Sequence, residues 1–331
     1  MGGDEHPTLV DLDGDGDLDA FVGDSYSYRM SNGGNTVFFV NVGLLLVSTI
    51  GNETLEGTPS PNDVATYVSA PSAVTVSLLT TTSQNTIGAG RDTLINIENL
   101  IGSNFNYNLT GEAKHNLLTG GAGNDTLRGW SGVDTMIGGL GNDSYFVENA
   151  GDVVTEKLNQ GTDNVSSNVT YTLLANVENI TLTGTTTING TGNFQANVIT
   201  DNAASNHMNG KVGNDTLDGK SGNNVFTGGT GSDIFRFTTK GQIDAITDYN
   251  VANDTIQLEN AVFTKLTTTG TLAAGQFRFG IQALDANDFV IYNDVTGALF
   301  YDANGSGAAA AVQIATIGVG LAMTNADIAV I

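Results

Sequence analysis

The chain of 331 residues has no cysteine, only 4 prolines and few aromatic residues, which make up 7% of it. A disulfide-bonded scaffold is therefore excluded. The lack of cysteine fits a cytosolic protein, and it equally fits an exported chain that must stay free of disulfides until it leaves the cell. So few aromatic side chains argue against a thick globular core and favour thin, repetitive layers.

Basic residues are also scarce, with 11 Lys and Arg against 35 Asp and Glu and a formal net charge of -24. Nucleic-acid binding and docking to anionic lipid both need a basic face, so both are disfavoured. The longest apolar run, residues 43–47, is far short of the roughly 20 residues of a membrane span. Residues 1–10 lack the basic start and apolar stretch of a signal peptide. Divalent cations are the natural partners of such a chain.

Glycine is abundant instead, at 43 residues, and it occurs in repeats. The pentapeptide GNDTL at 123–127 recurs at 213–217, and NIENL at 96–100 recurs as NVENI at 176–180. The middle of the chain is therefore predicted to be a duplicated unit, roughly 51–146 and 147–237, whose two halves look alike.

Within each half the sequence period is nine. Turns begin at Gly102, Gly111, Gly120, Gly129 and Gly138, and again at Gly192, Asp201, Gly210, Gly219 and Gly228. Position eight of every turn is apolar: Leu109, Leu118, Leu127, Met136, Tyr145, Ile199, Met208, Leu217, Phe226 and Phe235. These side chains are predicted to form one buried line. The pattern indicates a β-roll in which six residues turn, three make a short strand, and two nonapeptides complete one coil.

Position six of each turn is polar with one exception, Tyr107. The others are Asn116, Asp125, Asp134, Asp143, Asn197, Asn206, Asp215, Asn224 and Asp233. Turns on the same side lie 18 residues apart in sequence and about 4.7 Å apart in space, the usual strand spacing. Stacked carboxylates at that distance repel one another unless a cation lies between them. The simpler alternative is a metal-free solenoid that uses Asp and Asn only as turn formers.

The nonapeptide Gly-Gly-x-Gly-x-Asp-x-apolar-x resembles the RTX (repeats-in-toxin) calcium-binding repeat. The match covers 102–146 and 192–236, and the segment 120–127 fits it fully. The resemblance implies that each calcium ion lies between two turns on one side, held by Asp carboxylates and backbone carbonyls. Oxygen ligands without His or Cys suit calcium rather than zinc.

The pairs of turns can be ranked by charge. Asp125 with Asp143 and Asp215 with Asp233 are doubly acidic and are predicted to be the strongest sites. Two further pairs, Asn116 with Asp134 and Asn197 with Asp215, have one charge fewer. The pair of Asn206 with Asn224 has none, and Tyr107 removes a ligand from its pair with Asp125.

A different motif lies near the N-terminus, where carboxylates alternate along one segment: Asp11, Asp13, Asp15, Asp17 and Asp19. Gly16 stands at its sixth position, but Val22 occupies position twelve, where an EF-hand needs Glu. The flanking residues 8–10 and 20–22 are predicted to be strands. The segment resembles an FG-GAP or integrin-type blade, which implies calcium held by four Asp side chains and the carbonyl of Asp17.

After about residue 238 ordinary β patterning resumes, and residues 289–292 and 298–301 are predicted to pair as a hairpin. An open solenoid end exposes unpaired strand, so a cap is expected there. The region resembles the C-terminal domain of serralysin-type secreted proteins. Its tail, 327–331, is similar to their uncleaved type I secretion signal, the alternative being a plain C-terminal strand.

No catalytic site is expected. The three histidines, His6, His115 and His207, do not form the His-Glu-x-x-His zinc motif of serralysins, and no Gly-x-Ser-x-Gly motif is present. His115 and His207 fall at variable turn positions and are predicted to be surface residues. The acids are accounted for by the calcium turns.

The sequence thus predicts an all-β protein: a parallel β-roll in two duplicated blocks, with an N-terminal blade-like hairpin and a C-terminal β cap. Its expected segments are 1–46, 47–146, 147–237 and 238–331. We expect a secreted, non-catalytic module that binds several calcium ions, folds on calcium binding outside the cell and has a structural or carrier role. One alternative is a self-assembling filament, matrix or surface-layer subunit; another is an accessory region of a larger secreted enzyme or adhesin. A cell-surface or glycan partner is not identified by the sequence.

Overall fold

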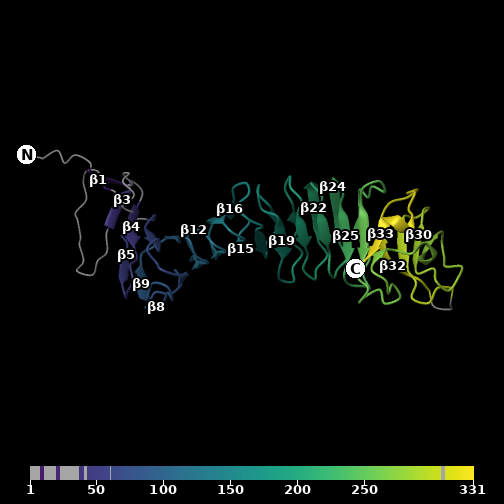
Figure 1. Cartoon of the computed structure of the whole chain (residues 1–331), viewed down its shortest axis with the longest axis horizontal. Coiled ribbons are helices and arrows are strands. Elements are labelled where there is room, and N and C mark those ends of the chain that lie inside the picture. The colour runs from purple at the N-terminus through teal and green to yellow at the C-terminus, as the bar shows by residue number, and fades with distance from the viewer. Residues whose placement is uncertain (1–7, 11–19, 23–36, 41–42, 60, 307–309) are drawn as a thin grey trace, which may run out of the picture. The chain divides into compact units, whose positions relative to one another are not determined.

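The computed structural model of the chain describes residues 8–10, 20–22, 37–40, 43–59, 61–306 and 310–331. They form short β-strands and two three-residue 3-10 helices, Ala274–Gln276 and Asn325–Asp327 (Figure 1). The predicted all-β class is confirmed. Two compact units are present, Met1–Thr162 and Asp163–Ile331. The four segments expected from the sequence stay a prediction.

In the first unit the chain alternates between two sheets, as a coil does. One sheet contains, in spatial order, β16 (Val153–Thr155), β14 (Thr135–Leu140), β12 (Leu117–Ala122), β10 (Asn99–Ile101), β6 (Val64–Thr66), β4 (Gly43–Val47) and β3 (Val37–Val40). The facing strands are β15 (Ser144–Val147), β13 (Thr126–Arg128), β11 (Asn108–Thr110) and β7 (Thr75–Ser77). A smaller sheet contains β5 (Thr54–Glu56), β9 (Arg91–Ile95) and β8 (Gln84–Asn85). The strands from β6 to β16 and from β7 to β15 pair in parallel.

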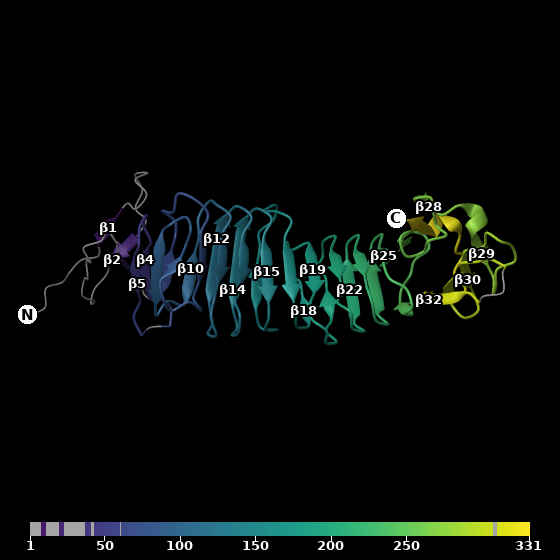
Figure 2. The same cartoon turned by 90° about the horizontal axis from the view of Figure 1, so that it is seen from below.

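The register of these sheets confirms that two nonapeptides make one coil. Leu100 pairs with Leu118 and Leu118 with Met136, each 18 residues further along the chain. The facing sheet has the same offset, because Leu109 pairs with Leu127. Figure 2 shows β10, β12 and β14 side by side as successive coils. Turns of the same kind are therefore stacked on each side of the roll.

The second unit has the same two-sheet arrangement. One sheet contains β17 (Asn164–Ser167), β19 (Asn179–Leu182), β21 (Val198–Thr200), β23 (Thr216–Asp218), β25 (Ile234–Phe237), β27 (Thr255–Leu258), β33 (Ile328–Val330) and β28 (Gly270–Thr271). The other contains β18 (Tyr171–Thr172), β20 (Gly190–Thr191), β22 (His207–Val212), β24 (Val225–Thr230), β26 (Asp244–Ile246), β32 (Val312–Thr316), β31 (Ala298–Tyr301), β30 (Val290–Asn293) and β29 (Phe277–Phe279). Ile199 pairs with Leu217 and Met208 with Phe226, so the 18-residue coil is retained.

The predicted strand length of three residues is found in only one of the two sheets of each roll. β11, β13, β21 and β23 have three residues, but β12, β14, β22 and β24 have six and continue into the following turn. There Gly121 pairs with Gly139 in the parallel ladder. Gly139 has a φ of 105°, and a Cβ on it would lie 2.0 Å from the Gly121 carbonyl oxygen. The longer pairing therefore depends on glycine, because any side chain would keep the coils apart.

The core is the line of position-eight side chains. All ten predicted members have an exposed fraction of 1% or less. At the end of the second block the line becomes aromatic, with the rings of Phe226 and Phe235 centred 6.1 Å apart. Burial of these apolar side chains, which come alternately from the two facing sheets, drives the sheets together.

Beyond β27 the second unit mixes parallel with antiparallel pairing. β30 and β31 form the predicted hairpin, with Val290 opposite Tyr301. β32 pairs in parallel with β26 and in antiparallel with β31, so the sheet ends in a different topology from the coils. The tail 328–330 is strand β33 and pairs with both β27 and β28. A change of strand direction of this kind ends the stacking of coils.

Candidate metal sites in the turns

The polar residues at position six are buried without exception. Their exposed fractions lie between 0% and 4%, for Asn116, Asp125, Asp134, Asp143, Asn197, Asn206, Asp215, Asn224 and Asp233. Carboxylates are rarely buried to this degree unless they are paired or bind a cation. The predicted candidates thus lie inside the turns and away from the surface.

The same kind of hydrogen bond joins these residues to a neighbouring coil: the backbone amide of one donates to the side-chain Oδ1 of the next. The Asp125 amide donates to Asp143 Oδ1 at 2.7 Å, and the Asp215 amide donates to Asp233 Oδ1 at 2.9 Å. Asp134 Oδ1 accepts from the Asn116 amide at 2.9 Å in the same way. We call each such column of residues a position-six ladder. Within the nonapeptides, neighbours in a ladder are 18 residues apart, so the structure brings together the pairs predicted from the repeats.

The second carboxylate oxygen of the ladder aspartates, Oδ2, has no hydrogen-bond donor. Oδ2 of Asp125, Asp134 and Asp215 is buried and accepts no hydrogen bond within the described part of the chain. It lies against the glycine that begins the same turn, since a Cβ on Gly120 would be 2.1 Å from Asp125 Oδ2. A buried anionic oxygen with no donor is strongly unfavourable by itself. Hard oxygen donors of this kind fit calcium, which these residues would hold.

Burial and mutual repulsion have the expected effect on proton binding. Burial is the main cause that raises the pKa of Asp125 to about 7, and repulsion from Asp143 and Glu156 adds to it. The pKa values of Asp134 and Asp215 rise to about 6, again mainly through burial. Burial also raises the pKa of Asp143 and Asp233. A divalent cation would remove this penalty by supplying the opposite charge.

In the turns with asparagine at position six, the side-chain amide finds hydrogen-bond acceptors in the backbone. Asn224 Nδ2 donates to the Gly219 carbonyl at 2.8 Å. Asn116 Nδ2 donates to the Glu98 carbonyl at 2.6 Å, and Asn197 Nδ2 to the Val177 carbonyl at 3.0 Å. The amide hydrogens therefore reach backbone oxygens that a carboxylate could only repel. This is a physical reason to expect weaker calcium binding at these turns.

Tyr107 keeps its place in a ladder through its backbone alone. Its amide donates to Asp125 Oδ1 at 2.6 Å, while its buried hydroxyl donates to the Tyr67 carbonyl at 3.2 Å. The tyrosine side chain thus offers no carboxylate to Asp125. That the pair binds no ion stays a prediction.

Three ladder members lie outside the nonapeptides and were missed by the sequence reasoning. Asp152 Oδ1 accepts from the Asp134 amide at 3.0 Å, Asp244 Oδ1 from the Asn224 amide at 2.8 Å, and Asp254 Oδ1 from the Asp233 amide at 3.0 Å. The spacing of 18 from Asp134 was a usable signal for Asp152. Asp244 follows Asn224 by 20 residues and Asp254 follows Asp233 by 21, so a search with a fixed period of 18 does not find them.

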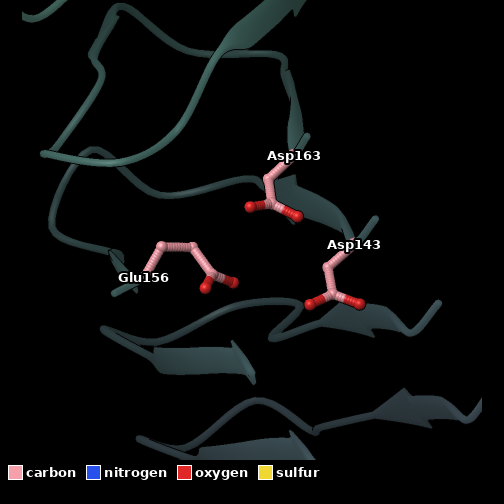
Figure 3. A group of neighbouring side chains, drawn as sticks. All are labelled: Asp143, Glu156 and Asp163. Carbon is pink, nitrogen blue, oxygen red and sulfur yellow. The ribbon is translucent and has the colours of Figure 1, made fainter. Parts of the chain in front are cut away.

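Glu156 is a further acid that the sequence reasoning missed. It follows Gly138 by 18 residues, so it occupies the first position of a turn, where most nonapeptides have glycine. Figure 3 shows its carboxylate beside that of Asp143, and ligand oxygens of the two lie within 4.8 Å of each other. The buried Tyr145 hydroxyl donates a hydrogen bond to Glu156. Within the first unit, Glu156 therefore adds a buried carboxylate to the pair of Asp125 and Asp143.

The N-terminal motif is described only at its flanks. Strands β1 (Thr8–Val10) and β2 (Ala20–Val22) form an antiparallel pair, as predicted, with Thr8 opposite Val22. The five acids of the motif, Asp11, Asp13, Asp15, Asp17 and Asp19, lie outside the described residues. The calcium loop and its FG-GAP resemblance stay predictions.

The described histidines are surface residues, as expected. Both His115 and His207 are exposed. His115 Nδ1 lies 2.9 Å from the Val133 carbonyl oxygen, so this ring nitrogen contacts the backbone.

Without calcium, the fold is expected to be more stable at pH 5 than at pH 8. The pKa values of Asp125, Asp134 and Asp215, at about 7, 6 and 6, are raised from 3.8, so the folded state binds protons that the unfolded chain has released. This contribution is fully present below about pH 4 and is lost as the pH rises through 6 and 7. Thermal unfolding in EDTA across this range measures it. A midpoint that rises with pH would contradict the assignment.

Comparison with known families agrees with this geometry. A family model for the RTX calcium-binding nonapeptide repeat matches residues 110–145 and 200–235, with four copies. No curated protein matches the chain. Neither of the helices in the described residues is long or apolar enough to cross a membrane. The stretches 110–145 and 200–235 are thus RTX calcium-binding nonapeptide repeats, and they form coils of a β-solenoid.

Proposed function

We propose that this protein is a secreted, non-catalytic calcium-binding β-roll that folds when it meets calcium outside the cell and acts there as a structural or carrier module. The observation that carries the proposal is the set of buried Oδ2 atoms of Asp125, Asp134 and Asp215, which accept no hydrogen bond in the described chain. Millimolar calcium would stabilise the folded state by binding it in preference to the unfolded chain.

A non-catalytic role is supported by how the acids are used. The carboxylates of the ladders are buried, and their Oδ1 atoms accept backbone amides. A general acid or nucleophile must instead reach a substrate. The two described histidines are exposed, and His115 contacts a backbone carbonyl. These positions suit a scaffold better than a reaction centre.

Export through a type I system is supported by the composition of residues 327–331, an acid followed by apolar residues. In the folded protein, residues 328–330 pair with β27 and β28, and Asp327 Oδ2 accepts the Thr324 amide at 2.6 Å. An exporter would therefore read the tail before the chain folds. Scarce calcium inside the cell would keep the repeats unfolded until then.

Deleting residues 326–331 is expected to abolish secretion from a host with a type I exporter. The first unit should still gain β structure on calcium addition, because the deleted strand pairs only within the second unit. Secreted and intracellular protein would be quantified, and the retained protein refolded and followed by circular dichroism. Secretion at the level of the full chain would remove the proposed export route.

A further inference from the structure

The column of position-one glycines in the first unit ends with an acid. Gly120 and Gly138 begin successive turns on one side of the roll. Because Ile137 pairs with Thr155 in the ladder of β14 and β16, Glu156 is the next residue of this column. Its exposed fraction is 7%. Glutamate is buried to this degree almost only where its charge is paired or binds a cation.

The Glu156 carboxylate reaches back to the coil of Asp143. The hydroxyl of Tyr145, a fully buried side chain, donates a hydrogen bond to Glu156 Oε1. This hydroxyl oxygen and Asp143 Oδ2 both lie 2.1 Å from the point where a Cβ on Gly138 would be. Ligand oxygens of Asp143 and Glu156 lie within 4.8 Å of each other, and Figure 3 shows the Glu156 carboxylate directed toward that of Asp143. Since calcium holds its ligands at roughly 2.3–2.6 Å, two oxygens up to about 5 Å apart can bind one ion.

Asp125 gives independent evidence that this column takes a cation. Its Oδ2 atom is buried and accepts no hydrogen bond in the described chain, and the residue is 1% exposed. The point where a Cβ on Gly120 would be lies 2.1 Å from this oxygen and 2.8 Å from the Gly138 carbonyl oxygen. The Asp125 amide donates to Asp143 Oδ1 at 2.7 Å, so the two residues are on adjacent coils. The unpartnered oxygen of Asp125 is therefore aimed at the turn that holds Asp143 and receives Glu156.

The second unit has the same two position-six acids without this arrangement. Asp215 and Asp233 form its doubly acidic pair. Phe235 takes the place of tyrosine at position eight, and its ring carbon Cζ lies 2.9 Å from the point where a Cβ on Gly228 would be. Asp248 follows Gly228 in the column, but it is exposed, and its carboxylate accepts two backbone amides of that turn at 2.9 and 2.8 Å. Two sites with the same charge in the repeat pattern therefore differ in the folded protein.

We propose that Glu156 is a further ligand of the calcium ion at Asp143, and that it makes the doubly acidic site of the first unit bind calcium more tightly than that of the second. The inference rests on the proposed calcium function and adds a residue from outside position six of the nonapeptides. A third carboxylate raises the ligand charge, which sets calcium affinity. Tyr145 is a positioning residue, because its hydroxyl holds the Glu156 carboxylate.

The test is isothermal titration calorimetry with calcium at pH 7.5, in the full chain with Asp215→Asn/Asp233→Asn as background. Asparagine occupies position six in other turns, so this background keeps the fold while it removes the charges of the second doubly acidic pair. Glu156→Gln keeps the size of the side chain and is expected to weaken the tightest calcium binding about tenfold or more. Asp248→Asn, the matched acid of the second unit, should leave this affinity unchanged.

Glu156→Asp separates direct ligation from the effect of a nearby charge. It keeps the charge but is one methylene shorter, so it should bind calcium more weakly than the background. Full affinity in this variant would mean that Glu156 acts only through its charge and would overturn its role as a ligand.

Tyr145→Phe tests the positioning residue and covers the case in which Glu156→Gln does not fold. It reproduces the residue of the second unit and should weaken calcium binding by a smaller factor than Glu156→Gln. Phe235→Tyr in the parent chain should leave the calcium affinities unchanged, because Asp248 is exposed. A folded Glu156→Gln or Tyr145→Phe protein with the affinity of its background would overturn the inference. If the parent chain itself bound no calcium, the proposed function would fail.

Discussion

Chelating calcium with EDTA is expected to abolish most of the far-ultraviolet β signal of the repeats at pH 7.5, and returning calcium to millimolar concentration is expected to restore it. The reason is the stacking of buried carboxylates along the ladders, where Asp143 lies on the coil next to Asp125 and Asp233 on the coil next to Asp215. Without a cation, each buried Oδ2 is deprived of both water and counter-charge. The carboxylates of each doubly acidic pair then also repel one another.

Circular dichroism followed through a calcium titration is the measurement. Magnesium at equal concentration is the control, because its demand for near-ideal octahedral geometry suits these turns poorly. Acidification to pH 5 in EDTA should return part of the signal, since protons remove the same charges. A β spectrum unchanged by EDTA at pH 7.5 would contradict the metal sites and favour the metal-free solenoid.

Reciprocal substitutions on the two sides of the first roll are expected to change calcium affinity in opposite directions. Asp125→Asn removes one charge from a doubly acidic pair and should weaken its calcium binding by about tenfold or more, because ligand charge sets affinity. Asn116→Asp adds a charge to the pair with Asp134 and should strengthen binding there. Both substitutions retain side-chain shape, so packing against Gly120 and Gly111 is preserved.

Isothermal titration calorimetry of both variants against the parent protein measures this effect. A tenfold change corresponds to about 1.4 kcal/mol of binding free energy. Asn142→Ser provides a control, since this residue lies next to Asp143 in the same turn but is exposed. A change of calcium affinity in the same direction for Asp125→Asn and Asn116→Asp would show that the ladder register, and with it the pairing, is wrong.

The repeating part of this protein could be predicted from the sequence because its geometry is local. Nine residues determine a turn and a strand, and every later repeat meets an identical neighbour. Position eight was therefore predictable as the core, and all ten side chains are buried. The pairing of Asp125 with Asp143 followed from the spacing of 18 alone. The hairpin of β30 and β31 was predictable from alternation around a turn.

The residues that depart from the repeat were decided by the tertiary structure. Asp244 and Asp254 join the ladders after insertions that change the spacing to 20 and 21 residues, so only coil stacking identifies their partners. The six-residue strands arise because a glycine on one coil approaches the backbone of the coil before it closely enough to pair, as Gly139 does with Gly121 and Gly229 with Lys211.

A calcium-binding β-roll was predictable from the amino-acid sequence alone, because the period of nine encodes the turn, the core and the ligand type together. Which buried charges face one another was decided only by the fold. Asn206 is neutral in the repeat pattern, yet its amide donates to the Asp201 carboxylate at the start of its own turn. Electrostatic interactions depend on distance in space and on burial, and neither is contained in the identity of a single residue.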